Sequence, residues 1–394
     1  MIDTCAKPRI LITFGTRPEA IKMFPVVFAL RDTGRFDVRV AVTAQHREML
    51  DAVLAMAGIE PDIDLDLMQP GQSLDALSAR IITRFGEALD TLKPDRVLVH
   101  GDTLTTMMAT LACYFRRIPV GHVEAGLRSG NIYSPWPEEV NRKVTGAIAD
   151  LHFAPTETAA AALRAENVAP GAIHVTGNTV IDAMRFARAK VASDPTLAPV
   201  VAPLQARFAG RRIIAVTAHR RENFGAGMQE IAAALQTLAK RDDVAIIYPV
   251  HPNPNVADVM RPALSGHDNI ALLNPLDYLD FVAMMAACDI VLTDSGGIQE
   301  EAPSHLLQII RSGARRSSHL QVSRCCCWLG SRPISERCAN DRQNCMARQL
   351  AGAGGNDCRS PAGSAGRCGP GAGSAGAPAR AQLRPDANSR ACSR

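Results

Sequence analysis

The chain has 394 residues, enough for two domains of ordinary size, and a hydrophobic fraction of 47% that can form a buried core in each. It contains no run of roughly 18 apolar residues, and its N-terminus lacks the basic, apolar and small-residue segments of a signal peptide. These properties argue against a membrane-spanning or exported protein. They predict a soluble, cytoplasmic one.

Charge and cysteine content change near residue 305. Residues 305–394 contain 14 Arg, no Lys and four acidic residues, a net charge of +10, although the whole chain carries only +4. The preceding part is therefore acidic on balance, at −6. Eight of the 11 cysteines also follow residue 304, and three scattered thiols before it fit a reducing compartment.

The first half of the chain alternates between short β-branched runs and helical stretches. Strands separated by helices of this length predict a parallel sheet with helices on both faces. The expected strands are residues 9–15, 37–44, 95–101, 119–126 and 151–156.

The pattern restarts after a proline-punctuated passage that ends near residue 203. The expected strands here are RIIAVTAH, VAIIYPVH, NIALLNP and DIVLTDSGG. The sequence therefore predicts an α/β protein with two Rossmann-like domains, residues 1–176 and 177–304, and a cleft between them. Ligands in such folds lie beyond the carboxyl ends of the strands, so polar residues there are the candidate site residues.

The stretch FGTRPEAIK predicts a helix that begins at an anion site. Thr16 and Glu19 form a capping box, and Pro18 fits the first helical turn. Arg17, with Lys22 one turn further on, is unfavourable at the positive end of the helix dipole unless an anion neutralises it. We predict a phosphate there; the alternative is simply a well-formed helix start.

Three carboxylates fall near strand or helix ends. Asp102 follows one strand in HGDTLTT, Glu124 follows the next in GHVEAG, and Glu138 lies in SPWPEEVNRK one helical turn before Arg142. Separately, Asp102 could cap a helix and Glu124 could be a satisfied buried acid. Glu138 and Arg142 could form a surface ion pair. Together, three carboxylates in one crevice favour acid/base chemistry on a weakly acidic carbon.

The second domain offers a second anion site. Ser295, Gly296 and Gly297 form a turn between a strand and a helix, where backbone N–H groups can approach a phosphate. Glu301, further into that helix, could accept ribose hydroxyls. The alternative is that the glycines only permit the turn.

Histidines occur at two other strand ends of this domain. His219 and Arg220 follow one strand and are predicted to face the ligand. His251, in PVHPNPN, is expected to be structural or to support a site residue, and it is left out of the catalytic set.

The chain resembles the non-hydrolysing UDP-N-acetylglucosamine 2-epimerases from about residue 9 to residue 304. FGTRPEAIKM, VLVHGDT, IPVGHVEAGLRSG, YSPWPEEVNR, HRRENFG and LTDSGGIQEEAPS carry the resemblance in order and spacing. It implies a two-domain glycosyltransferase B fold, a homodimer and no cofactor. The implied reaction interconverts UDP-N-acetylglucosamine and UDP-N-acetylmannosamine by elimination and re-addition of UDP, without nucleic acid or membrane partners, to supply precursor for surface polysaccharide.

The resemblance also implies roles for the candidate residues. Asp102, Glu124 and Glu138 would move the C2 proton, with the carboxylate for each face left open, and Arg142 would orient Glu138. The departing diphosphate would be held by Arg17, Lys22, His219 and the turn at Ser295, Gly296 and Gly297, with Glu301 on the ribose and Phe281 on the uridine. Leu276 stands where the family pattern usually has Gln, which predicts looser base recognition.

Residues 305–394 do not continue the resemblance. Their composition is rich in Arg, Ala, Gly, Ser, Pro and Cys without Lys, and the segment from 351 to 380 is of low complexity. The cysteines lack the paired spacing of zinc sites, so no metal site is predicted. We interpret this tail as out of frame, and we expect the second domain to be incomplete, to lack the strand after EEAPS and to have little activity.

Two other functions remain open on the residues alone. A glycosyltransferase could share the fold, because fold does not fix function. A non-catalytic nucleotide-sugar binder would keep the phosphate sites without the chemistry. The three carboxylates and the lack of an identifiable acceptor site favour the epimerase.

Overall fold

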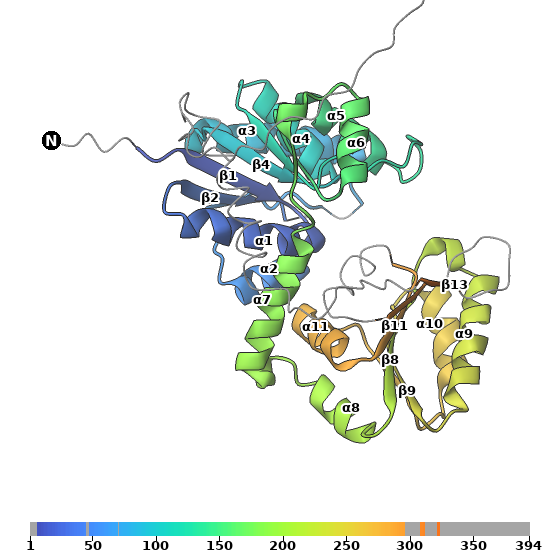
Figure 1. Cartoon of the computed structure of the whole chain (residues 1–394). Helices are drawn as coiled ribbons and strands as arrows, with labels where there is room; N and C mark the ends of the chain where they lie inside the picture. The colour runs from blue at the N-terminus through green and yellow to red at the C-terminus, as the bar shows by residue number, and fades with distance from the viewer. Residues whose placement is uncertain (1–5, 45–46, 70, 296–307, 312–320, 324–394) are drawn as a thin grey trace, which may run out of the picture. The chain divides into compact units, whose positions relative to one another are not determined.

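The computed structural model describes residues 6–44, 47–69, 71–295, 308–311 and 321–323, which form two sheets with helices on both faces of each (Figure 1). The predicted α/β class is confirmed. No helix within these described ranges is long and apolar enough to cross a membrane.

The first sheet has seven parallel strands in the order β3-β2-β1-β4-β5-β6-β7. Its strands are β1 Arg9–Phe14, β2 Asp37–Val42, β3 Ile63–Asp64, β4 Arg96–His100, β5 Val120–Val123, β6 Leu151–Ala154 and β7 Ile173–Val175. Its helices are α1 Arg17–Asp32, α2 Arg47–Ala57, α3 Leu74–Leu92, α4 Leu104–Tyr114, α5 Glu138–Ile148 and α6 Glu157–Ala165. The strand order reverses between β1 and β4, which is where such sheets bind ligands.

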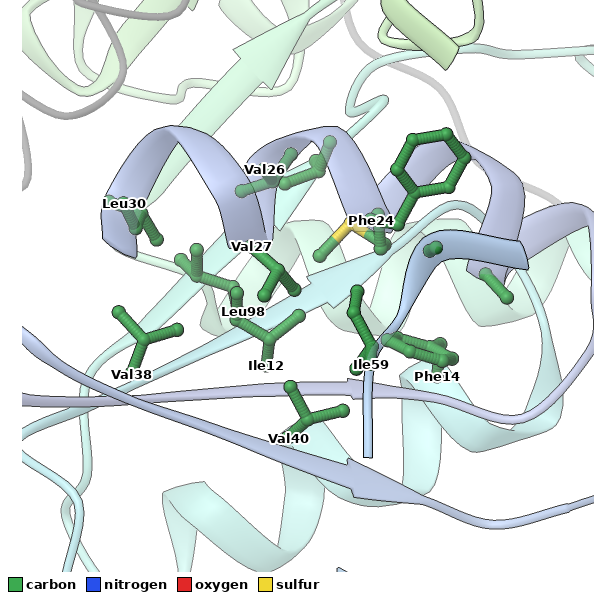
Figure 2. Packing of buried hydrophobic residues seen from close by; sticks show 14 of the residues in the cluster. Ile12, Phe14, Phe24, Val26, Val27, Leu30, Val38, Val40, Ile59 and Leu98 are labelled. Atoms are coloured by element: carbon green, nitrogen blue, oxygen red, sulfur yellow. The ribbon is translucent and has the colours of Figure 1, made fainter. Parts of the chain in front are cut away.

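Alternate residues of the central strands are buried on opposite faces of this sheet. Ile12 and Phe14 of β1 pack against α1 with Val38 and Val40 of β2, as Figure 2 shows, whereas Leu11 contacts the cluster under α3 and α4. The α1 side chains in that packing are Phe24, Val26, Val27 and Leu30. Burial on both faces explains why the strands read as continuous apolar runs, and it holds the strand ends in fixed positions.

The second sheet has six strands in the order β10-β9-β8-β11-β12-β13, all parallel except β13. Its strands are β8 Arg212–Thr217, β9 Val244–Pro249, β10 Ile270–Leu273, β11 Ile290–Thr293, β12 Gln308–Arg311 and β13 Gln321–Ser323. Its helices are α8 Val201–Arg207, α9 Ala226–Ala239, α10 Pro254–Leu264 and α11 Tyr278–Ala287, whereas α7 Val180–Ser193 packs against α1 and α11. Here the order reverses between β8 and β11.

Strand β12 contradicts the prediction that no strand follows EEAPS. Gln308–Arg311 pairs in parallel with β11, so that Thr293 lies opposite Arg311. The edge of β11 is therefore covered by β12. The short run Gln-Ile-Ile-Arg was too brief to show a period, but its two β-branched residues suit pairing with a neighbouring strand that is already formed.

Candidate active site

The first sheet brings its candidate residues to one edge. Arg17, Asp102 and Glu124 each follow a strand by one to three residues, and these strands, β1, β4 and β5, are neighbours in the sheet. Gly101 has a φ of 68° and Glu124 a φ of 61°. Left-handed backbone is ordinary for glycine but costly for glutamate, and such strain is concentrated at functional sites.

Glu124 is held as a carboxylate by two basic side chains. Its Oε2 accepts a hydrogen bond from Lys22 Nζ of α1 and lies 2.9 Å from His100 Nε2 at the end of β4. Desolvation alone would raise the pKa of Glu124, but His100 and Lys22 together lower it to about 2. Glu124 is therefore ionised at neutral pH and cannot serve as a proton donor in this state.

Asp102 is tied to α5 through Arg142. Arg142 Nη2 donates to Asp102 Oδ2, and Arg142 Nη1 donates to Glu139 Oε2 at 3.1 Å. Asn141 Nδ2 also donates to the Asp102 carbonyl, at 2.8 Å. The predicted pairing of Arg142 with Glu138 is therefore wrong: the arginine extends to the neighbouring acid and to a strand end 40 residues away.

Glu139 is the acid that the sequence analysis missed. Its side chain is fully buried, and its carboxylate accepts hydrogen bonds from the backbone N–H groups of Ser129, at 3.0 Å, and Gly130, at 3.2 Å. Burial tends to raise the pKa of Glu139, but these N–H groups and Arg142 hold it below its ordinary value. The available signal was its place in the first turn of α5, where a carboxylate is favoured, but Glu138 shares that place.

Glu138 differs from the other acids of the cluster. It is half-buried at the start of α5, and its Oε2 is enclosed without a hydrogen-bond partner among the described residues. Asp102, Glu124 and Glu139 all have a cationic neighbour. A buried carboxylate oxygen that lacks a donor is costly, and this marks Glu138 as a candidate for contact with a ligand.

The predicted helix start at Thr16 is confirmed. Thr16 and Glu19 form the capping box, and Glu19 is 2% exposed. Arg17 follows directly, and no described carboxylate pairs with its guanidinium, whereas Lys22 is paired with Glu124. Arg17 is therefore a positive side chain at the positive end of the helix dipole with no described anion beside it, which is the feature that predicted a phosphate site.

The edge of the second sheet is organised by Asp294, which directly follows β11. Its Oδ2 accepts hydrogen bonds from the backbone N–H groups of His219, at 3.0 Å, and Arg220, at 2.8 Å, and from Asn223 Nδ2, at 2.9 Å. The neighbouring Ser295 N–H donates to Thr293 Oγ1 at 2.9 Å. One buried carboxylate therefore fixes the loop after β8, which carries His219, against the end of β11.

His219 stacks on His251. Their rings are nearly parallel, at 6°, with centroids 5.4 Å apart. Desolvation lowers the pKa of His219 against the opposing effect of Asp294, so the ring is neutral at physiological pH and can donate one hydrogen bond through its N–H while its other nitrogen accepts. His251 therefore packs against a predicted site residue.

The structure says less about the remaining candidate residues of the second predicted domain. Phe281 is partly buried on α11 and packs against the apolar cluster under α8 and α11, as does Leu276. Gly296, Gly297 and Glu301 lie outside the described residues. Within the described ranges, no three His, Cys, Asp or Glu side chains are grouped closely enough to hold a metal ion.

Comparisons with known proteins agree with this arrangement. The family model "UDP-N-acetylglucosamine 2-epimerase" matches residues 28–340. The chain is 55% identical to a probable UDP-N-acetylglucosamine 2-epimerase of Ralstonia nicotianae over 298 residues, 75% of this chain and 80% of that protein. It is 53% identical to the UDP-N-acetylglucosamine 2-epimerase of Yersinia pestis over 301 residues, 75% of this chain and 79% of that one.

A solved relative has the same fold. The crystal structure of UDP-GlcNAc 2-epimerase from Neisseria meningitidis, bound to UDP-GlcNAc, is 45% identical, with a TM-score of 0.70 over 77% of this chain and 82% of that one. The fold is thus glycosyltransferase B-like, as the resemblance implied. By family model, sequence identity and fold, the chain belongs to the UDP-N-acetylglucosamine 2-epimerase family.

Proposed function

We propose that the site of this chain interconverts UDP-N-acetylglucosamine and UDP-N-acetylmannosamine by eliminating UDP and adding it back after C2 is reprotonated on the other face. The observation that supports this best is the difference among the three predicted carboxylates. Glu124 is held ionised by Lys22 and His100, Asp102 is paired with Arg142, and Glu138 has an enclosed oxygen without a partner. Proton transfer at two faces needs carboxylates in different environments.

The anion sites have separate roles in this proposal. Arg17 and Lys22 at the start of α1 would stabilise the diphosphate as it leaves, together with a neutral His219 and the turn that begins at Ser295. Gly296, Gly297, Glu301 and Phe281 would complete nucleotide binding. Arg142 would orient Asp102, and Glu139 would keep Arg142 in place.

We further propose the domain boundaries 1–176 and 177–304, a homodimer, and a cytoplasmic location. The first proposed domain supplies all seven strands of the first sheet, the second supplies β8 to β11 of the second sheet, and β12 and β13 add residues after 304 to that sheet. Residues 305–394 would be largely out of frame. The family match ends at residue 340, so family-like sequence would persist for a short distance past 304.

The test is solvent exchange at C2. A version of the chain with its reading frame restored, incubated with UDP-N-acetylglucosamine in D2O, should gain deuterium at C2 and form UDP-N-acetylmannosamine, as followed by NMR. Asp102→Asn should slow both by about 100-fold. Epimerisation without deuterium incorporation would exclude the elimination route, and UDP release only with an added acceptor would favour the glycosyltransferase.

A further inference from the structure

His100 is the basic residue at the candidate active site that has no assigned role. It ends β4, and its side chain is 5% exposed. Its Nε2 lies 2.9 Å from Glu124 Oε2, a charge contact whose geometry falls short of a hydrogen bond, and its Nδ1 is likewise enclosed without a hydrogen-bond partner among the described residues. Because Nε2 is the ring nitrogen that lies within contact distance of a carboxylate, the proton belongs on Nε2.

Lys22 and His100 approach the same oxygen of Glu124 from different elements. Lys22 reaches Oε2 from α1, and His100 reaches it from β4, while no described residue donates to Oε1. The two contacts are not equivalent. The Lys22 side chain is 22% exposed on a flexible stem, whereas His100 is enclosed in the sheet.

The Glu124 backbone has a conformation that is uncommon for its residue type. Glu124 leaves β5 with a left-handed φ of 61°, which costs free energy for an L-residue and is kept where the surroundings hold it. If Lys22 is drawn to the diphosphate of the substrate, one of the two side chains that hold the carboxylate is withdrawn. His100 is then the remaining described group on that oxygen.

We propose that His100 is a positioning residue that holds Glu124 in place and ionised, with Oε1 left for the substrate, while Lys22 turns to the diphosphate. This role rests on the proposed epimerase function. It predicts that replacing His100 raises the pKa of Glu124 only a little while Lys22 remains in contact with Glu124. The rise should be larger once an anion competes for Lys22.

The experiment follows the titration of Glu124 in the full 394-residue chain, labelled with ¹³C at the glutamate Cδ positions. Glu124→Gln identifies the resonance by its disappearance. His100→Leu removes the donor, His100→Gln places an amide N–H near the position of Nε2, and His174→Leu on β7 is the matched control. Each protein is titrated without and with saturating UDP, which supplies the diphosphate.

The proposal expects the apparent pKa of Glu124 to rise by about one unit or more in His100→Leu with UDP bound, and by less without UDP. His100→Gln should restore most of the difference, and His174→Leu should match the wild type. Should His100→Leu not fold, as judged by near-UV circular dichroism, His100→Asn replaces it, because its shorter amide cannot reach Glu124.

A Glu124 titration in His100→Leu, or in its Asn replacement, that matches the wild type with UDP bound would overturn the proposal. So would an equal rise with and without UDP. These outcomes are independent of turnover. Failure of the epimerase proposal itself would appear as an absence of C2 deuterium in the frame-restored wild type.

Discussion

Thr103 Oγ1 donates a hydrogen bond to Glu19 Oε1 at 2.6 Å, and this bond joins the N-termini of α4 and α1. The other oxygen of Glu19 accepts from the backbone N–H groups of Gly15, at 3.0 Å, and Thr16, at 2.8 Å. Thr103 adjoins Asp102, and Thr16 adjoins Arg17. One buried carboxylate thus fixes the acid/base edge and the predicted phosphate site relative to each other.

Replacing this carboxylate should destabilise the protein. Glu19→Ala leaves several buried donors without an acceptor, so the free energy of unfolding should fall by about 3 kcal/mol, measured as a lower urea midpoint. Glu60→Ala, at an exposed acid of the same part of the chain, is the control and should change the midpoint little. Equal midpoints for the two variants would show that Glu19 is not needed to hold these loops.

Stability should depend on pH through His122, which is 1% exposed and lies 2.7 Å, through Nε2, from the Gly101 carbonyl oxygen. Desolvation lowers the pKa of His122 from 6.5 to about 3, so as the pH falls below 6.5 the unfolded chain takes up a proton that the folded protein does not. Stability should therefore be lost between pH 6.5 and 3, with a slope from this residue of about 1.4 kcal/mol per pH unit.

Urea unfolding between pH 8 and pH 5 tests this dependence. His122→Gln removes the titrating group and should flatten the curve, whereas His251→Gln, at an exposed histidine, should follow the wild type. Parallel curves for His122→Gln and the wild type would contradict the prediction.

Glu138 and Glu139 should separate activity from stability. Glu139→Gln weakens a fully buried carboxylate that accepts three hydrogen bonds, so it should lower the urea midpoint, by about 2 kcal/mol of stability. Glu138→Gln should leave the midpoint nearly unchanged, because no described residue donates to its enclosed oxygen, but it should slow C2 exchange by about 100-fold. The reverse pattern would assign the chemical role to Glu139.

The 394-residue chain itself should have little or no epimerase activity compared with the frame-restored form. Its composition after residue 350 cannot supply the apolar side chains that close a domain. Sequencing the gene around codon 304 and assaying both forms side by side tests this. A confirmed frame, with turnover equal to that of the restored protein, would refute the interpretation of the tail.

Much of the fold was predictable because its signals are local. The capping box of Thr16 and Glu19 is a short-range pattern, and the central strands are apolar runs bounded by turn residues. Strands β3 and β7 were missed because two and three residues carry no period. Strand β12 was also missed because its run is short, and the structure shows that it pairs with β11, a contact that the run itself does not reveal.

The site was predictable only in part, because its contacts join distant residues. Strand ends located Asp102 and Glu124, but helical spacing suggested the wrong partner for Arg142, whose hydrogen bond to Asp102 spans 40 residues. Glu139 directly follows Glu138 in the sequence EE, and His100 lies two residues before Asp102 in HGD, so the sequence analysis selected Glu138 and Asp102 instead. Only the packing of α5 and β4 shows which of each pair is enclosed.

At position 124 the backbone conformation and the proposed reaction favour different residues. In a saturation library at position 124, selection for folding alone should enrich Gly, Asn and Asp, which adopt a φ of 61° most readily. Selection for turnover should instead retain Glu, although glutamate is conformationally disfavoured there. The difference between the two sets of residue frequencies would measure how far the residue that turnover requires differs from the residues that folding favours at this position.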